Sequence, residues 1–101
     1  MAFEAGALDA TIAAAAGDDP ALFAELREAF HASAVRQLDL LRRSRCDGNW
    51  NIAGLRLKGL ASSFHADQLL ALADEVMDAA PGEPSVLRRL QVYLDGFAAA
   101  D

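Results

Sequence analysis

The chain has 101 residues and a formal net charge of −6 at pH 7, and 53% of its residues are hydrophobic. This length fits one domain, residues 1–101, and the hydrophobic content is enough to build its core. The negative charge argues against a nucleic-acid partner and against an anionic membrane surface, because both attract basic faces. The sequence contains no run of about 18 apolar residues, so we expect no membrane-spanning helix.

Few residues could carry chemistry. Cys46 is the single cysteine, which excludes an internal disulfide, and His31 and His65 are the two histidines. These residues lack the spacing of metal ligands, so no metal or other cofactor is expected. The N-terminal residues include Glu4 and Asp9 and no basic stretch, which argues against a secretory signal. We therefore expect a cytoplasmic protein.

The first two helices are predicted from apolar spacing and from turn residues. Residues 6–16 are expected to form a short helix that ends at Gly17, because glycine commonly follows a helix C-terminus. Asp18 or Asp19 followed by Pro20 is typical of a helix start. Apolar residues then recur at intervals of three or four, which predicts a buried stripe on the longest helix: Phe23, Leu26, Phe30, Ala34, Leu38 and Leu41.

The second half of the chain predicts three further helices. A turn at residues 47–49 precedes the third helix, which runs from about residue 49 to residue 64. The fourth helix is expected over about residues 67–80, and Pro84 begins the fifth. No segment has strand-like alternation. The pattern predicts an all-α fold, an antiparallel up-down four-helix bundle with a short N-terminal helix across one end.

The third helix has an unusual outer face. Its buried stripe is expected to hold Trp50, Ala53, Leu57, Leu60, Ala61 and Phe64. At about 100° per residue, Leu55 lies roughly 170° from the centre of that stripe. Ile52, Gly59 and Ser62 share its side of the helix, and Lys58 borders it. Two branched aliphatic residues beside a glycine are either incidental or covered by a neighbouring element, or they form a contact surface.

The segment from Gly54 to Phe64 reads Gly-Leu-Arg-Leu-Lys-Gly-Leu-Ala-Ser-Ser-Phe. It resembles the helix that carries the active site in bacterial histidine-containing phosphotransfer (HPt) domains, whose signature is His-x-Leu-Lys-Gly-(small)-Ala. Four positions match that signature: Leu57, Lys58, Gly59 and Ala61. The resemblance extends over about the whole chain, since Asp19-Pro20 is similar to the start of the family's second helix.

The resemblance implies a phosphorelay scaffold without its reaction centre. The phosphoryl-accepting histidine of the family falls at Leu55, and leucine has no lone pair with which to attack an aspartyl phosphate. The resemblance also implies that Lys58 is the cation beside the phosphoryl group and that Gly59 lets a docked partner approach. His65 stands where the family commonly has glycine, and we expect it to end the helix in a left-handed conformation.

The leading hypothesis is a binding module without enzymatic activity. By resemblance, it would bind a response-regulator receiver domain or a histidine kinase of a bacterial two-component phosphorelay, as a monomer or weak homodimer. The residues expected to contact this partner are Ile52, Leu55, Arg56, Lys58, Gly59 and Ser62.

Two alternatives remain open. The first is an active phosphotransfer protein that uses an unconventional histidine, His65 or His31. The second is a helical protein of unrelated function in which the match around Leu57-Lys58-Gly59 is a coincidence. The sequence predicts neither the identity of the partner nor the direction of its regulation.

Overall fold

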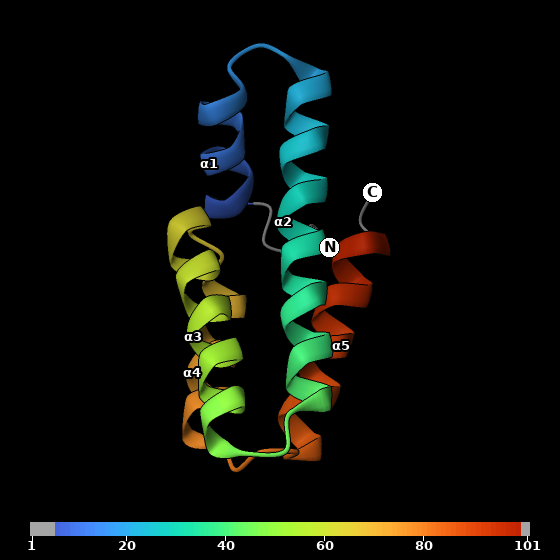
Figure 1. Ribbon diagram of the computed structural model, residues 1–101. Coiled ribbons are helices and arrows are strands. Elements are labelled where there is room, and N and C mark those ends of the chain that lie inside the picture. Colours follow the sequence, from blue (N-terminus) through green and yellow to red (C-terminus); the bar gives the residue numbers. More distant parts are fainter. Residues whose placement is uncertain (1–5, 100–101) are drawn as a thin grey trace.

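The computed structural model describes residues 6–99, with the side chains of residues 6–97. It contains five helices, α1 (Ala7–Ala16), α2 (Pro20–Arg43), α3 (Asp47–Phe64), α4 (Asp67–Asp78) and α5 (Pro84–Ala99) (Figure 1). No strand occurs within this range, so the prediction of an all-helical fold is confirmed. Two helix ends differ slightly from the prediction: α3 begins at Asp47 and not at about residue 49, and α4 ends at Asp78 and not at about residue 80.

The helix ends follow from local residues. Asp19 caps α2, since its carboxylate accepts hydrogen bonds from the backbone N–H groups of Ala21 (3.0 Å) and Leu22 (3.2 Å). Gly17 ends α1 with φ 64°. His65 ends α3 in the left-handed conformation, with φ 58° and ψ 38°, as predicted. The next N–H, that of Ala66, donates to the carbonyl of Ala61 at 2.8 Å, which is the hydrogen bond of a Schellman motif.

The helices pack side by side along the long axis of the molecule (Figure 1). The molecule measures 44 × 23 × 18 Å along its principal axes. α3 packs against α2 and α4, and α5 packs against α2 and α4. The first half of α2 extends beyond these contacts and lies beside α1. The short turn at residues 17–19 reverses the chain, so α1 runs along α2 beyond the end of α3 and is aligned with the long axis, not across the end of the bundle as predicted (Figure 1).

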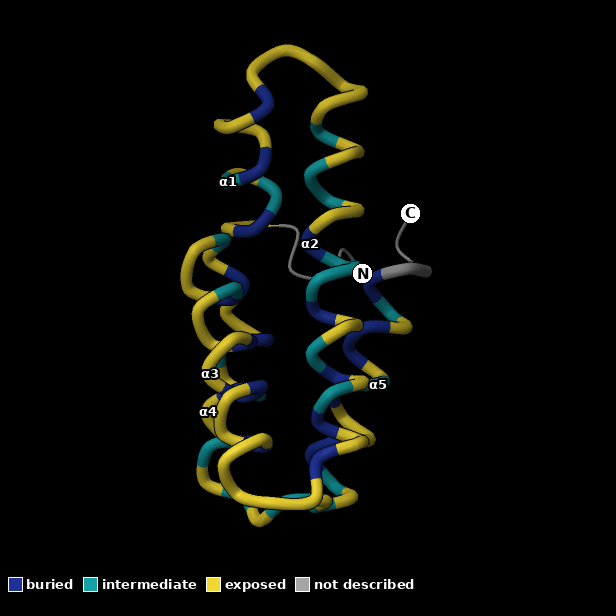
Figure 2. The backbone as a smooth tube through the Cα atoms, viewed as in Figure 1, coloured by how far each residue is buried: buried dark blue, intermediate teal, exposed yellow. Residues whose placement is uncertain are grey.

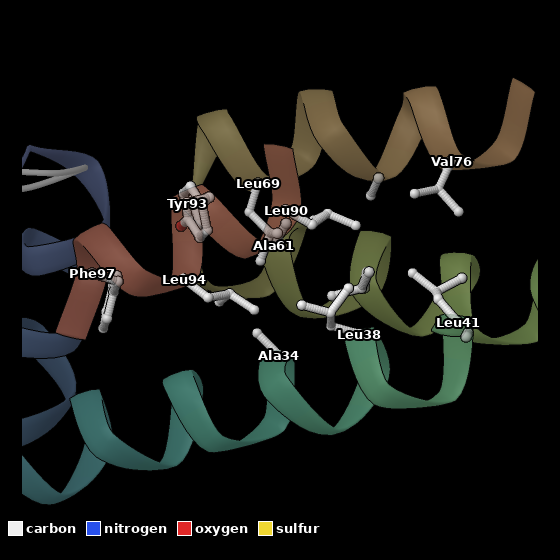
Figure 3. Packing of buried hydrophobic residues seen from close by; sticks show 14 of the residues in the cluster. Ala34, Leu38, Leu41, Ala61, Leu69, Val76, Leu90, Tyr93, Leu94 and Phe97 are labelled. Carbon is white, nitrogen blue, oxygen red and sulfur yellow. The ribbon is translucent and has the colours of Figure 1, made fainter. Parts of the chain in front are cut away.

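The core lies between the inner faces of the helices, where buried positions gather (Figure 2). Side chains from α2, α3, α4 and α5 meet there, among them Ala34, Leu38, Ala61, Leu69, Val76, Leu90 and Leu94 (Figure 3). Trp50 is fully buried, and its indole N–H donates to the carbonyl of Val76 at 2.8 Å. This hydrogen bond satisfies the polar atom of a residue that otherwise contributes a large apolar area.

The predicted stripe of α3 is correct at its centre and too wide at its edge. Trp50, Ala53, Leu57 and Ala61 are buried, whereas Leu60 and Phe64 are only partly buried and pack against the core. Phe64 contacts Phe30 with 5.1 Å between the ring centroids. Leu60 lies at the edge of the stripe and Phe64 in the last turn, where neighbouring helices enclose a side chain less completely.

Candidate functional site

The outer α3 face, which we define as Ile52, Leu55, Arg56, Lys58, Gly59 and Ser62, points away from the core. All six residues are exposed, and Leu55 and Ile52 keep 56% and 49% of their surface accessible. Leu57, two residues from Leu55, has no accessible surface. The structure therefore brings the six predicted contact residues onto one surface, in the predicted orientation relative to the core.

Lys58 is tied to the neighbouring helix. Its ammonium lies 3.1 Å from the carboxylate of Asp74 on α4, and both side chains are about half exposed. An exposed ion pair of this kind contributes little to stability and exchanges readily with other partners. Lys58 is thus available at the edge of the outer α3 face, although it is not a free cation.

The two glycines in the middle of α3 have different surroundings. A methyl group added at Gly59 would meet no atom within 4 Å, so the fold does not need a glycine there. A methyl group at Gly54 would lie 2.8 Å from the sulfur of Met77 and 3.0 Å from Cγ1 of Val76. Gly54 therefore permits the close approach of α4, a role that the sequence analysis missed. The position at Gly59, one turn from Leu55, is open.

A groove runs between α2 and α3, next to the outer α3 face. It consists of two adjoining hollows of about 650 and 390 Å³, which share Leu40, Arg43 and Arg56. The larger hollow is also lined by Val35, Arg36, Gln37 and Asp39, and the smaller one by Ser44, Asn49, Ile52 and Ala53. We call this surface the α2–α3 groove. Ile52 and Arg56 belong both to it and to the outer α3 face.

Three arginines surround the groove. Arg43 pairs with Asp39 at 2.8 Å, both side chains being exposed, and Arg36 donates a hydrogen bond to the hydroxyl of Ser33 at 3.0 Å. Arg56 forms no ion pair with any residue in the described part of the chain. The carbonyl oxygen of the Gln37 side chain is buried and accepts no hydrogen bond from the described residues. None of the α2 residues in this groove was predicted from the sequence to be a site residue.

His65 lies at the C-terminal end of α3, beside α1. Its Nδ1 is 2.9 Å from the hydroxyl oxygen of Thr11, and that hydroxyl donates to the carbonyl of Ala7 at 2.8 Å. Because the single hydroxyl proton is directed to Ala7, the hydrogen-bond network assigns the imidazole proton to Nδ1. The neutral ring then carries its lone pair on Nε2. This nitrogen is a possible nucleophile, about 15 Å along the helix from Leu55.

His31 lies between α2 and α5 and has a structural environment. Its Nε2 is 3.1 Å from the carbonyl of Leu94, which can only accept a hydrogen bond, so this nitrogen carries a proton. The ring is partly buried and stacks on Phe97, with 5.4 Å between the centroids and 4° between the planes. Neither His31 nor His65 belongs to the outer α3 face.

The pKa values of Glu75 and Arg89 are shifted, and these two residues form an ion pair outside the outer α3 face and the α2–α3 groove. Arg89 on α5 approaches Glu75 on α4 through both of its terminal nitrogens, at 2.7 and 2.9 Å. The hydrogen bond from Arg89 lowers the pKa of the Glu75 carboxyl, and the same bond raises the pKa of Arg89. Both side chains are exposed, and each neutralises the charge of the other. We therefore interpret the pair as a surface contact between α4 and α5 and not as a catalytic pair.

Neither a family model, nor a curated protein, nor a solved structure matches the chain. Within residues 6–99, none of the helices has the length and apolar character needed to cross a membrane. In the same part of the chain, no three side chains of histidine, cysteine, aspartate or glutamate gather into a group that could hold a metal ion.

Proposed function

We propose that the chain is an HPt-like binding module that does not transfer phosphate. In this proposal α2, α3, α4 and α5 correspond to the antiparallel four-helix bundle of HPt domains, and α1 is the additional N-terminal helix. The partner is a response-regulator receiver domain or a histidine kinase of a bacterial phosphorelay. The partner docks on the outer α3 face, and the chain regulates the relay by occupying this partner.

The observation that carries the proposal is the environment of Leu55. This residue stands where the HPt signature has histidine, and more than half of its surface is exposed. Ile52 lies beside it, and the open position at Gly59 adds no obstacle to a docked protein. Complete burial of a leucine contributes about 1.5–3 kcal/mol to the free energy of association. Leu55 therefore strengthens a contact with a docked protein, whereas a histidine at this position could accept a phosphoryl group.

The other signature residues support the same interpretation. Leu57 is a core residue, and Lys58 stands one turn from Leu55 with its charge accessible at the edge of the face. A cation at this edge attracts an acidic partner and thereby increases the rate of association more than the final affinity.

The alternative function, phosphotransfer through an unconventional histidine, is favoured at His65 by one observation. The contact with Thr11 fixes the proton on Nδ1 and leaves Nε2 with a lone pair. His31, by contrast, is partly buried and stacked on Phe97, so the lone pair that remains on its Nδ1 is less accessible than that of the exposed His65. The alternative therefore concerns His65 before His31.

A combined binding and transfer experiment tests the proposal. The wild-type protein, His31→Ala and His65→Ala are each mixed with a phosphorylated receiver domain and with an autophosphorylated histidine kinase. We expect binding by calorimetry and no acid-labile phosphate on the wild type. Acid-labile phosphate that is absent from His65→Ala would instead establish the alternative. Absence of both binding and transfer for every partner tested contradicts the proposal.

A further inference from the structure

The α2–α3 groove combines four apolar residues with three arginines. Leu40 and Ala53 lie in it with Val35 and Ile52, which keep 42% and 49% of their surface accessible. Its charged residues are three arginines and one carboxylate, Asp39, on a chain whose net charge is −6. The groove is therefore opposite in charge to the chain as a whole.

We propose that the α2–α3 groove binds one acidic amphipathic helix of the partner protein. The apolar stripe of that helix contacts Val35, Leu40 and Ile52, and its carboxylates pair with Arg43 and Arg56. The inference rests on the proposed function, because it specifies which kind of segment the docked partner presents.

The shape of the groove favours a helix as its occupant. It extends along α2 from Val35 to Ser44, a length of about 14 Å, or between two and three helical turns. An amphipathic helix can bind with its apolar face in a hollow between two packed helices. Residues 6–99 offer no strand edge for an extended peptide, and the groove has no aromatic residue of the kind that receives proline-rich segments.

The charges of the groove favour an acidic occupant. Arg56 has no ion-pair partner in the part of the chain that the structure describes, and the exposed Arg43–Asp39 pair can exchange partners at little cost. A guanidinium group accepts a carboxylate through two parallel hydrogen bonds, so the two arginines offer directional contacts and not only charge.

A second copy of this chain fits the groove less well. Two grooves related by a two-fold axis would bring Arg36, Arg43 and Arg56 of both copies together, and like charges repel.

Labelled peptides test the inference with the full chain. Three peptides of about 18 residues, or five helical turns, serve as probes in fluorescence anisotropy titrations. The first has a leucine stripe at helical spacing flanked by glutamates, the second has lysine in place of each glutamate, and the third is the acidic composition in scrambled order. A short DNA duplex serves as a fourth probe, because arginines can also bind phosphates.

We expect the acidic amphipathic peptide to bind more tightly than the other three probes, with an affinity that falls as salt is added. Arg43→Glu and Arg56→Glu should each weaken its binding by about threefold to tenfold, which corresponds to the loss of an exposed ion pair and its replacement by repulsion. Arg88→Glu on α5 is the matched control, since it changes the same charge at an exposed position outside the groove. It should change the affinity by less than about twofold.

Several outcomes would overturn the inference. They are equal binding of the scrambled peptide, an equal effect of Arg88→Glu, preferred binding of the DNA duplex, or self-association that Arg56→Glu abolishes in sedimentation. The proposed function fails separately. If the peptide does not bind while a receiver domain or kinase does, only the present inference is wrong. If the peptide binds and no receiver domain or kinase does, the groove remains and its assigned partner class is wrong.

Discussion

At the scale of single residues, the contrast between Leu55 and Leu57 defines the candidate site. The two leucines are two positions apart on one helix, and one is 56% exposed while the other is completely buried. Helical geometry made this contrast predictable, because the apolar stripe fixed which side of α3 faces the core. An exposed leucine makes most of its contribution only when a partner covers it, and it offers no atom for phosphoryl transfer.

The change Leu55→His tests the proposed correspondence between α3 and the active-site helix of HPt domains. On the proposed function, we expect this variant to take up acid-labile phosphate from a phosphorylated receiver domain, because Lys58 and Gly59 of the HPt signature lie one turn from position 55 and are exposed as it is. The measurement is the amount of radiolabelled phosphate on the chain before and after acid treatment.

The matched control for this assay is Leu55→Gln, which is polar and has no imidazole nitrogen, and it should remain unlabelled. Robust labelling of the wild type contradicts the account. Failure of Leu55→His alone does not, because transfer also needs the attacking nitrogen in line with the phosphoryl group.

At the scale of elements, the two glycines in the middle of α3 have different roles. Gly54 faces α4, where Val76 and Met77 leave no room for a side chain, whereas Gly59 faces open space. The sequence identified Gly59 through its place in a motif but could not distinguish the environment of Gly54. That distinction depends on the distance between α3 and α4, which tertiary packing sets and which no local pattern contains.

The two glycines predict opposite effects of the same substitution. Gly59→Ala should stabilise the fold by about 0.5–1 kcal/mol, because alanine is the better helix former and no atom obstructs its methyl group. Gly54→Ala has the same gain in helix propensity, but displacing the buried and stiff Val76 costs about 1–3 kcal/mol. The net effect on the free energy of unfolding should therefore be destabilising. The free energy of unfolding in urea measures both.

Each variant controls for the other, because the helix and the chemical change are the same. Equal shifts of the unfolding midpoint in the same direction would mean that α3 and α4 are not packed as closely as the structure has them.

At the scale of the whole molecule, charge is unevenly distributed over the helices. The α2–α3 groove carries Arg36, Arg43 and Arg56, whereas exposed carboxylates lie along α4: Asp67, Asp74, Glu75 and Asp78. The net charge of −6 therefore describes the chain and not the surface that we propose as the docking site. If the proposed partner is acidic, this asymmetry would orient it toward the groove before contact.

The fold could be predicted from the sequence to a greater extent than the site. Proline, glycine and aspartate marked the helix ends, and apolar spacing placed Trp50 and Leu57 inside. The groove was less accessible, because it joins Val35 on α2 to Arg56 on α3, and their register depends on how the two helices pack. The position of α1 beside α2 likewise follows from tertiary contacts, which the sequence pattern does not specify.

The most direct test of the central claim is the affinity of Leu55→Asp for the receiver domain or kinase that binds the wild type. The measurement is isothermal titration calorimetry, with Val92→Asp on α5 as the matched control, since Val92 is an aliphatic residue that is 65% exposed. Gly59→Arg, which would place a long side chain in the open space one turn from Leu55, provides a second variant of the same face. Thermal melts must first show that all three variants are as stable as the wild type.

The account predicts that Leu55→Asp weakens binding by at least about tenfold, because a carboxylate would be buried at the centre of an apolar contact. Gly59→Arg should weaken binding as well, and Val92→Asp should leave it unchanged. Unchanged affinity for both Leu55→Asp and Gly59→Arg would contradict the account, because the outer α3 face would then not be the interface.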